Sequence, residues 1–196
     1  MLSRVYSFHN PTCPSRPLSY DRTAPPHRLS KRVADESSVT SPNVTDLTEQ
    51  QEEIRSRYPE YGHHPAMIRE MAALWGDPPH NENGVLETTE RLSILEGQKQ
   101  WKAEVRLAQT PSGRYAMSTS HQYPSGGGSS APGVGDHRAY LSRDAAIEAG
   151  YNELIKRFAG VRDWKGTRPH TEPIIAEKMI EHLEKLKGRS NQMTLF

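Results

Sequence analysis

The side chains best suited to catalysis or metal binding are the histidines and the single cysteine. His63 and His64 are adjacent, so they point in different directions at the start of an expected helix, and no CxxC or HExxH motif accompanies them. His80 stands near Glu82 in a loop rich in proline and asparagine, without a second ligand pair. Cys13 has no histidine at a fixed spacing, and no serine lies in a GxSxG turn. We therefore predict no metal, no cofactor and no enzymatic activity. An unrecognised nuclease or other enzyme is kept as the least favoured class of function.

The glycine-rich stretch "PSGGGSSAPGVGD", residues 124–136, is the other candidate for chemistry. A phosphate-binding loop has the pattern GxxxxGK[ST] between a strand and a helix, so that backbone N–H groups and one lysine converge on the ligand. No lysine follows Gly126, Gly127 or Gly128 directly, and the second glycine pair leads to the anionic Asp136. We interpret this stretch as the flexible tip of a long hairpin.

The composition indicates a small protein without a membrane span. Only 34% of the 196 residues are hydrophobic and the mean hydropathy is −0.81, which predicts a modest core and disorder in part of the chain. No apolar run approaches the ~20 residues that a membrane helix needs, and no signal segment stands at the N-terminus. Because the single cysteine cannot form an internal disulfide, we expect a cytoplasmic protein in a reducing compartment.

Charge is divided unevenly along the chain, although the net charge is only +1. Residues 46–98 hold 11 acidic and 4 basic residues, whereas residues 99–170 hold 6 acidic and 11 basic residues. The interpretation that we favour is that the two segments dock on each other. The alternative assigns the basic segment to nucleic acid, through side chains on the polar face of its predicted sheet. These side chains are Lys102, Arg106, Arg114 and Arg138.

Residues 1–45 are predicted to be a disordered basic arm, because six prolines punctuate the segment and no apolar periodicity runs through it. Short acidic helices are expected within 46–98. Thr48 and Gln51 have the spacing of a capping box at the start of the first helix, and Pro65 suits the first turn of the second. A third and weaker helix is expected within 84–96.

The basic segment 99–170 has the clearest secondary-structure pattern. Apolar and charged residues alternate over 102–108, a Thr-Pro-Ser-Gly turn follows, and a second strand is expected over 114–121. A third strand is expected over 138–141, after which Ser142 is placed to cap a helix whose apolar face covers the sheet. The result is a small β-β-β-α module, and the predicted fold class is α+β.

Residues 171–187 are predicted to form a C-terminal amphipathic helix. Thr171 can cap it, Pro173 fits its first turn, and a narrow apolar stripe follows. The stripe either packs on the module or pairs with a second copy to give a homo-oligomer, and the sequence leaves both open. Gly188 is expected to close the helix, so that 189–196 would be loose peptide.

The last five residues are Gln192, Met193, Thr194, Leu195 and Phe196, and apolar side chains are seldom kept at a loose terminus unless a partner receives them. "QMTLF" resembles the pentapeptide, commonly QLxLF or QxxLF, by which bacterial replication and repair proteins bind the DNA polymerase sliding clamp. The resemblance covers 5 of 196 residues. It implies that Gln192 is a polar anchor, that Leu195 and Phe196 fill an apolar pocket, and that Met193 replaces the more usual leucine.

A second resemblance, carried by "LSRDAAIEAGYNEL" within 99–160, is to small uncharacterised plasmid and phage accessory modules, and it implies no activity. Together these features predict a non-enzymatic bacterial, phage or plasmid accessory protein of DNA replication or repair. Residues 188–196 would recruit it to the sliding clamp, and direct contact with DNA is a further expectation. The alternative is an inhibitor or antitoxin-like protein that binds a host DNA-processing enzyme.

Overall fold

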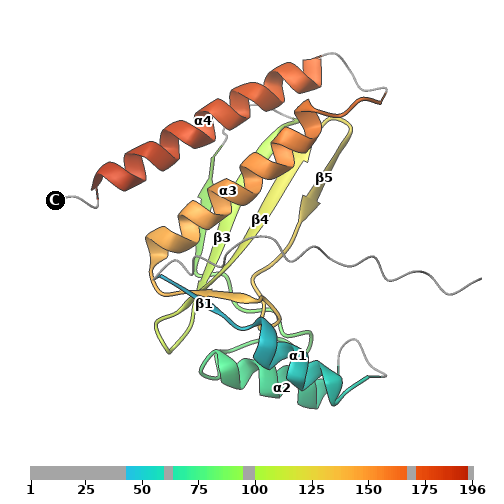
Figure 1. The fold of residues 1–196 in the computed structure, drawn as a ribbon, viewed down its shortest axis with the longest axis vertical. Coiled ribbons are helices and arrows are strands. Elements are labelled where there is room, and N and C mark those ends of the chain that lie inside the picture. Colours follow the sequence, from blue (N-terminus) through green and yellow to red (C-terminus); the bar gives the residue numbers. More distant parts are fainter. Residues whose placement is uncertain (1–42, 60–63, 95–99, 167–170, 194–196) are drawn as a thin grey trace, which may run out of the picture. The chain divides into compact units, whose positions relative to one another are not determined.

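The strands of this chain pair into one antiparallel sheet. The computed structural model describes residues 43–59, 64–94, 100–166 and 171–193, with no side chain described beyond Gly188. The strands are β1 (Val44–Asp46), β2 (Glu90–Ser93), β3 (Lys102–Gln109), β4 (Tyr115–Tyr123), β5 (Gly126–Ser129) and β6 (Arg138–Tyr140). Their order is β1-β6-β4-β3-β2, and β5 pairs with the end of β4 beside this path (Figure 1).

Helices lie on one face of the sheet and at one of its ends. In the described residues they are α1 (Thr48–Ser56), α2 (Pro65–Leu74), α3 (Arg143–Arg162) and α4 (Thr171–Met193). Helix α3 packs on β3 and β4, α4 packs on α3, and α1 and α2 lie together near the β3–β4 turn (Figure 1). Among the described residues, no helix is both long and apolar enough to cross a membrane.

The main core lies between the sheet and α3. Alternation along β3 buries Ala103, Val105 and Leu107 on the side that faces α3, whereas the residues between them are more exposed. The same core contains Leu154, Phe158 and Val161 of α3 and Ala176, Met179 and Leu183 of α4. The apolar stripe of α4 is thus buried against α3, which is the first of the two roles that the sequence left open.

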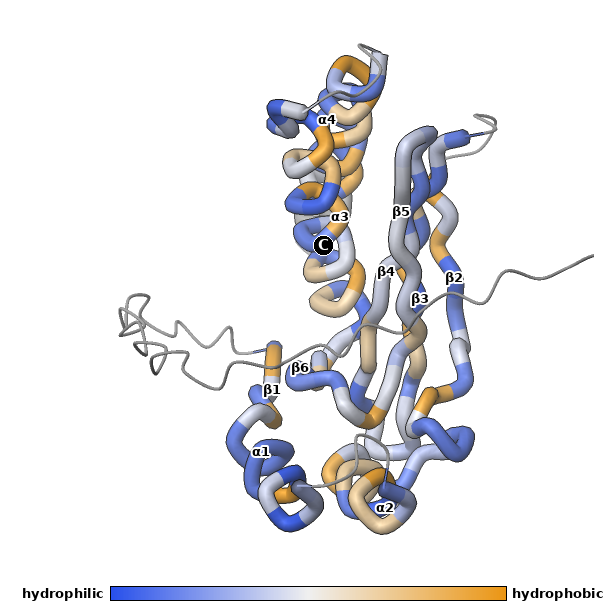
Figure 2. Tube along the Cα trace, turned by 90° about the vertical axis from the view of Figure 1, so that its right-hand side faces the viewer, coloured by the Kyte–Doolittle hydropathy of each residue, from blue (hydrophilic) through white to orange (hydrophobic). Residues whose placement is uncertain are grey.

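A second core joins α1 and α2 to the end of the sheet. Trp75 is fully buried, and its indole Nε1 donates a hydrogen bond to the carbonyl oxygen of Val134 over 3.0 Å. Gln51 is also buried and donates to the same carbonyl oxygen over 3.0 Å. α1 is mostly hydrophilic, while α2 is more apolar and supplies Met67, Ile68 and Met71 (Figure 2). The acidic and basic segments therefore pack together, mainly through apolar side chains.

The α+β fold class is confirmed, and so are several elements. The strands predicted over 102–108, 114–121 and 138–141 correspond to β3, β4 and β6. Ser142 caps α3, because its hydroxyl oxygen accepts a hydrogen bond from the N–H of Ala145 over 3.2 Å. Helices are present at both predicted positions in the acidic segment.

Other expectations are corrected. The predicted helix within 84–96 is wrong, because Glu90–Ser93 forms β2, whose alternate residue Leu92 packs on the main core. The flexible glycine tip is also wrong in part, since Gly126–Ser129 forms β5. The capping box at Thr48 does not form: its N–H donates instead to the carboxylate of Asp46 over 2.8 Å.

The limits of two terminal segments also differ from the prediction. Val44 and Thr45 belong to β1, so the predicted arm ends earlier than residue 45, and its residues 1–42 lie outside the described residues. Helix α4 continues through Gly188 to Met193 instead of ending at residue 187. Glycine costs only about 1 kcal/mol inside a helix, which a flanking run of good helix formers can offset.

Candidate functional site

The end of α4 is where the structure places the start of the predicted partner-binding peptide. Among the residues of this helix whose side chains are described, Leu183 is the last fully buried one, and Glu184 and Lys185 after it are exposed. At about 1.5 Å per residue, the ten residues from Glu184 to Met193 carry the backbone roughly 15 Å past Leu183. In Figure 1 these last turns of α4 extend past the first turn of α3.

The four predicted partner-binding residues divide at the end of this helix. Gln192 and Met193 are its last two residues, so the backbone of the pentapeptide begins in a helical turn. The expectation that the chain is loose from residue 189 is therefore wrong up to Met193. Leu195 and Phe196 lie outside the described residues.

The face of the sheet that points away from α3 carries the charged side chains of β3 and several polar side chains of β4. Lys102 and Arg106 lie on this face, as the alternation predicts, and the strand register places Lys102 opposite Gln122 and Arg106 opposite Ser118. This open face also carries Glu104 between the two cations. It is therefore polar and moderately basic.

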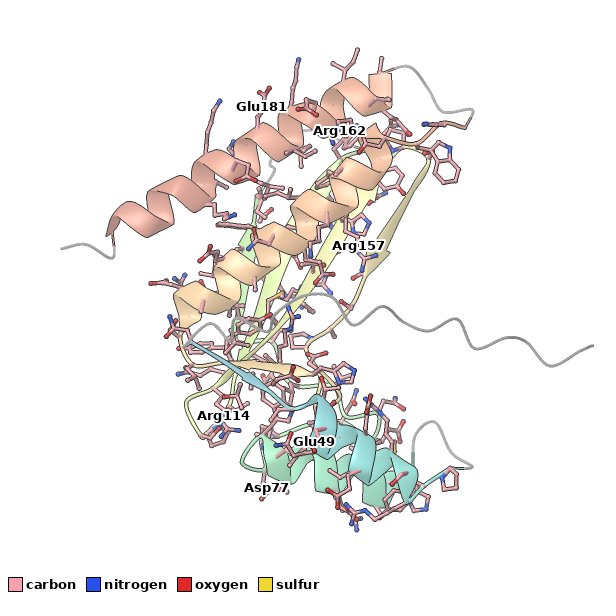
Figure 3. All side chains as sticks on the ribbon, in the orientation of Figure 1. Glu49, Asp77, Arg114, Arg157, Arg162 and Glu181 are labelled. Carbon is pink, nitrogen blue, oxygen red and sulfur yellow. The ribbon has the colours of Figure 1, made fainter. Side chains whose placement is uncertain are left out.

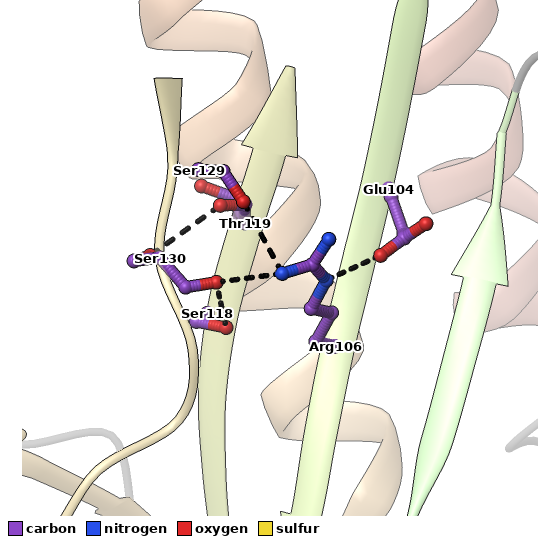
Figure 4. Close-up of polar contacts among 6 residues, drawn as sticks. All are labelled: Glu104, Arg106, Ser118, Thr119, Ser129 and Ser130. Atoms are coloured by element: carbon purple, nitrogen blue, oxygen red, sulfur yellow. Dashed lines mark hydrogen bonds and ion pairs between the residues drawn. The ribbon is translucent and has the colours of Figure 1, made fainter. Parts of the chain in front are cut away.

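Arg106 is already held by neighbouring groups of its own chain (Figure 4). Its guanidinium pairs with the carboxylate of Glu104, and its Nη1 donates to the hydroxyl of Ser129 and to the carbonyl oxygen of Ser130, both over 3.2 Å. The Ser118 hydroxyl donates to the same Ser130 carbonyl over 3.1 Å. A phosphate at this position would have to replace or share these bonds.

The other two predicted nucleic-acid-binding residues lie elsewhere. Nη1 of Arg114 donates to the carbonyl oxygen of Leu74 over 2.9 Å, at the C-terminal end of α2, where the helix dipole favours a positive charge. Arg138 lies on β6 two residues before Tyr140, which packs into the main core, so Arg138 is on the opposite face from Lys102. The structure brings together only the first two of the four.

Arg91 is a residue of the open face that the sequence interpretation missed. β2 pairs with β3 in a register that places Arg91 directly opposite Arg106. The sequence Glu-Arg-Leu-Ser over 90–93 holds a single apolar residue, which is too little to separate a strand from a weak helix, although burial alternates along the strand once it is formed. With Arg91 included, three cations and one carboxylate share this face.

Two of the histidines that the sequence singled out have hydrogen-bonding neighbours near the N-terminal helices. Nδ1 of His64 accepts from the N–H of Ala66 over 3.2 Å and caps α2, and Nδ1 of His80 lies 2.8 Å from the carbonyl oxygen of Pro78. His63 and Cys13 lie outside the described residues. Within the described ranges, no three His, Cys, Asp or Glu side chains are grouped so that they could hold a metal ion.

The candidate surfaces are therefore the C-terminal end of α4 with its peptide and the open face around Arg91, Lys102 and Arg106. Residues 192–196 are predicted to bind a partner's apolar pocket, and the cations of the open face are predicted to bind phosphate groups; both stay predictions. Comparison with known proteins gave no matching family model, no matching curated protein and no matching solved structure.

Proposed function

We propose that this is a non-enzymatic, cytoplasmic accessory protein of bacterial, phage or plasmid DNA replication or repair, recruited to the DNA polymerase sliding clamp by residues 192–196. The observation that supports it best is the pentapeptide "QMTLF" itself, whose first two residues form the end of α4, ten residues along the helix from the buried Leu183.

The expected affinity is modest. Burying Met193, Leu195 and Phe196 contributes roughly 1.5–3 kcal/mol each, while fixing five backbone residues costs roughly 1–2 kcal/mol each. Gln192 and the peptide backbone then supply about 1 kcal/mol per hydrogen bond, and similar bonds are lost where the last helical turn opens. The balance predicts micromolar binding at best, which is a binding free energy of about −8 kcal/mol. A second contact would raise this through avidity.

The test is a titration of a purified bacterial sliding clamp with the full chain and with the Leu195→Ala/Phe196→Ala variant. We expect micromolar binding that falls at least tenfold in the variant, with an unchanged melting temperature because both residues follow the last residue of α4. The matched control is Glu184→Ala/Lys185→Ala, which changes exposed residues of the same helix and should leave binding unchanged. No detectable binding at hundreds of micromolar would refute recruitment to the clamp.

Contact with DNA through the open face is favoured by the alignment of Arg91, Lys102 and Arg106 across β2 and β3. We expect the triple alanine variant to lose weak, salt-dependent binding of duplex DNA, since each phosphate contact contributes about 0.9 to the slope of log K against log salt. Arg138→Ala, on the opposite face, is the control. If DNA binding survives the triple change, these cations serve as ion-pair partners of the chain's own carboxylates and do not bind DNA.

A further inference from the structure

A cleft of about 640 Å³ lies between the β4–β5 hairpin and the second half of α3, on the face of the sheet opposite the open face. Thr119, His121 and Tyr123 of β4 line it from the sheet, because they alternate on the side that faces α3. Lys156 and Arg157 of α3 line the facing wall. Figure 3 shows Arg157 on the side of α3 toward β5.

The glycines of β5 lie close to the two aromatic rings of β4 at this cleft. A Cβ atom on Gly128 would lie 3.0 Å from Cε1 of His121, and one on Gly126 would lie 3.0 Å from the hydroxyl oxygen of Tyr123. β5 therefore presents bare backbone to the cleft. A stricter limit holds at Gly127, where a Cβ atom would lie 2.6 Å from the carbonyl oxygen of His121.

The outer edge of β5 supplies backbone hydrogen-bond donors at the cleft. The N–H of Ser130 donates to the carbonyl oxygen of Thr119 over 3.1 Å, and the alternation of an antiparallel ladder then directs the N–H groups of Gly127 and Ser129 away from β4. No strand of the described chain pairs with this edge. Both residues line the cleft.

The side chains at the cleft carry a net positive charge. Lys156 and Arg157 are exposed, and one carboxylate, Glu153, faces them. Glu153 accepts hydrogen bonds from the hydroxyl of Thr119 over 3.0 Å and from Nη2 of Arg157 over 3.3 Å. Among the lining side chains, two cations therefore face a single carboxylate that is already shared between two donors.

His121 adds a buried polar atom that lacks a partner in the described chain. Its Nδ1 is buried and accepts or donates no hydrogen bond among the described residues. Burial and the positive charge of Arg157 lower the pKa of His121, so the ring is neutral at pH 7. One of its two ring nitrogens can then accept a hydrogen bond. A buried polar atom without a protein partner is uncommon in native folds, and here it adds a hydrogen-bonding group to the lining of the cleft.

Trp164 gives the cleft an aromatic wall. Its side chain follows α3, lines the cleft and is 56% exposed, which is unusual for so large an apolar group. The indole is held against Gly166, where a Cβ atom would come within 2.3 Å of its Nε1. An exposed aromatic ring beside two cations has the composition of sites that stack a base and bind its phosphate.

We propose that this cleft binds one nucleotide unit, with the phosphate held by Lys156, Arg157 and the outward N–H groups of β5 and the base stacked on Trp164. A free nucleotide and a nucleotide within single-stranded DNA present the same groups. The cations and backbone donors select an anion, and the indole selects a planar ring over a simple carboxylate ligand. The site is on different residues from the clamp peptide and does not depend on recruitment to the clamp.

The test uses the full chain, without a clamp, titrated with dTMP and with a twelve-residue oligothymidylate at low salt. Trp75 and Trp101 are buried, so quenching of the exposed Trp164 should report binding, and the Trp164→Phe variant should lose the quenching signal. We expect Lys156→Ala/Arg157→Ala to weaken oligonucleotide binding at least tenfold and to reduce the salt slope by roughly 1–2. Anisotropy of a labelled oligonucleotide should show that Trp164→Ala binds at least fivefold more weakly and Trp164→Phe nearly normally.

The charge-matched control is Lys178→Ala/Lys185→Ala, which removes two exposed cations from α4 and should change binding less than twofold. Binding of dTMP as tight as that of the oligonucleotide identifies a free-nucleotide site, and much tighter binding of the oligonucleotide identifies a strand-binding site. The proposal is overturned if neither ligand binds, if the control loses as much affinity as the cleft variant, or if only the Arg91/Lys102/Arg106 variant loses binding.

Discussion

Glycine at position 150 of α3 should be more stable than alanine even though it lies in the middle of a helix. Alanine in place of glycine ordinarily stabilises a helix interior by about 1 kcal/mol. Here a Cβ atom at position 150 would lie 2.6 Å from Cγ1 and 2.8 Å from Cγ2 of Val105, whereas carbon atoms normally pack at about 3.5–4.0 Å. Val105 is fully buried and β-branched, so its side chain cannot rotate away cheaply.

The overlap requires α3 to move by roughly 1 Å from the sheet, and overpacking of this kind costs about 1–3 kcal/mol. We therefore expect Gly150→Ala to lower the free energy of unfolding by about 1–3 kcal/mol. Gly160→Ala is the matched control in the same helix, because no atom lies within 4 Å of its added Cβ, and it should gain about 0.5–1 kcal/mol. Urea unfolding followed by circular dichroism measures both.

A double-mutant cycle separates the overlap from other effects of the glycine. Val105→Ala removes both methyl groups that the new Cβ would meet, so it should cost less in the Gly150→Ala background than in the natural chain. We expect a coupling energy of about 1 kcal/mol or more. A coupling near zero, or Gly150→Ala as stable as Gly160→Ala, would refute the close approach of α3 to β3.

Three further predictions concern buried polar groups and one cap. Burial raises the pKa of Asp136 to about 6 from 3.8, so the folded state binds this proton more tightly and the charged carboxylate opposes folding at higher pH. Asp136→Asn should therefore stabilise the protein by about 2–3 kcal/mol at pH 7 but not at pH 4, and an equal gain in urea unfolding at both pH values would contradict this. Glu172 is buried and accepts hydrogen bonds from the N–H and the hydroxyl of Ser125 over 2.8 and 2.7 Å. Glu172→Ala should therefore lower the free energy of unfolding by about 2–3 kcal/mol and expose the first turn of α4 to hydrogen exchange. The control Glu177→Ala should lower it by under about 0.5 kcal/mol. Ser142→Ala should cost about 1 kcal/mol in thermal unfolding through loss of the α3 cap, and no change would show that water replaces it.

The elements that sequence could predict are those with local signals. Val105 and Leu107 alternate with charged residues over the length of β3, and Ser142 precedes a long apolar helical face, so strand, cap and helix were all visible without tertiary information. The side-chain period of two also placed Lys102 and Arg106 on one face correctly. These are cases in which neighbours in the chain are also neighbours in structure.

The elements that could not be predicted depend on distant partners. β2 is only four residues long, and its apolar residue Leu92 finds its place through pairing with β3. β5 consists of three glycines and a serine, which carry no strand propensity, and it forms through its pairing with β4. Likewise, nothing near Arg114 in the sequence indicates that a carbonyl of α2 receives its side chain.

The two proposed contacts lie at opposite ends of α4, and this has a functional consequence. Glu172, in the first turn of the helix, is tied to Ser125 in the β4–β5 turn beside the cleft, and Arg162 at the end of α3 pairs with Glu177 over 3.0 Å. From Glu172 to Met193 the helix spans roughly 30 Å at about 1.5 Å per residue. A clamp that holds the peptide therefore need not contact the cleft, so the two sites can be occupied together and each can be removed by substitution without loss of the other. Simultaneous occupation would convert two weak affinities into one stronger attachment, which is the condition under which a micromolar tail is sufficient for recruitment.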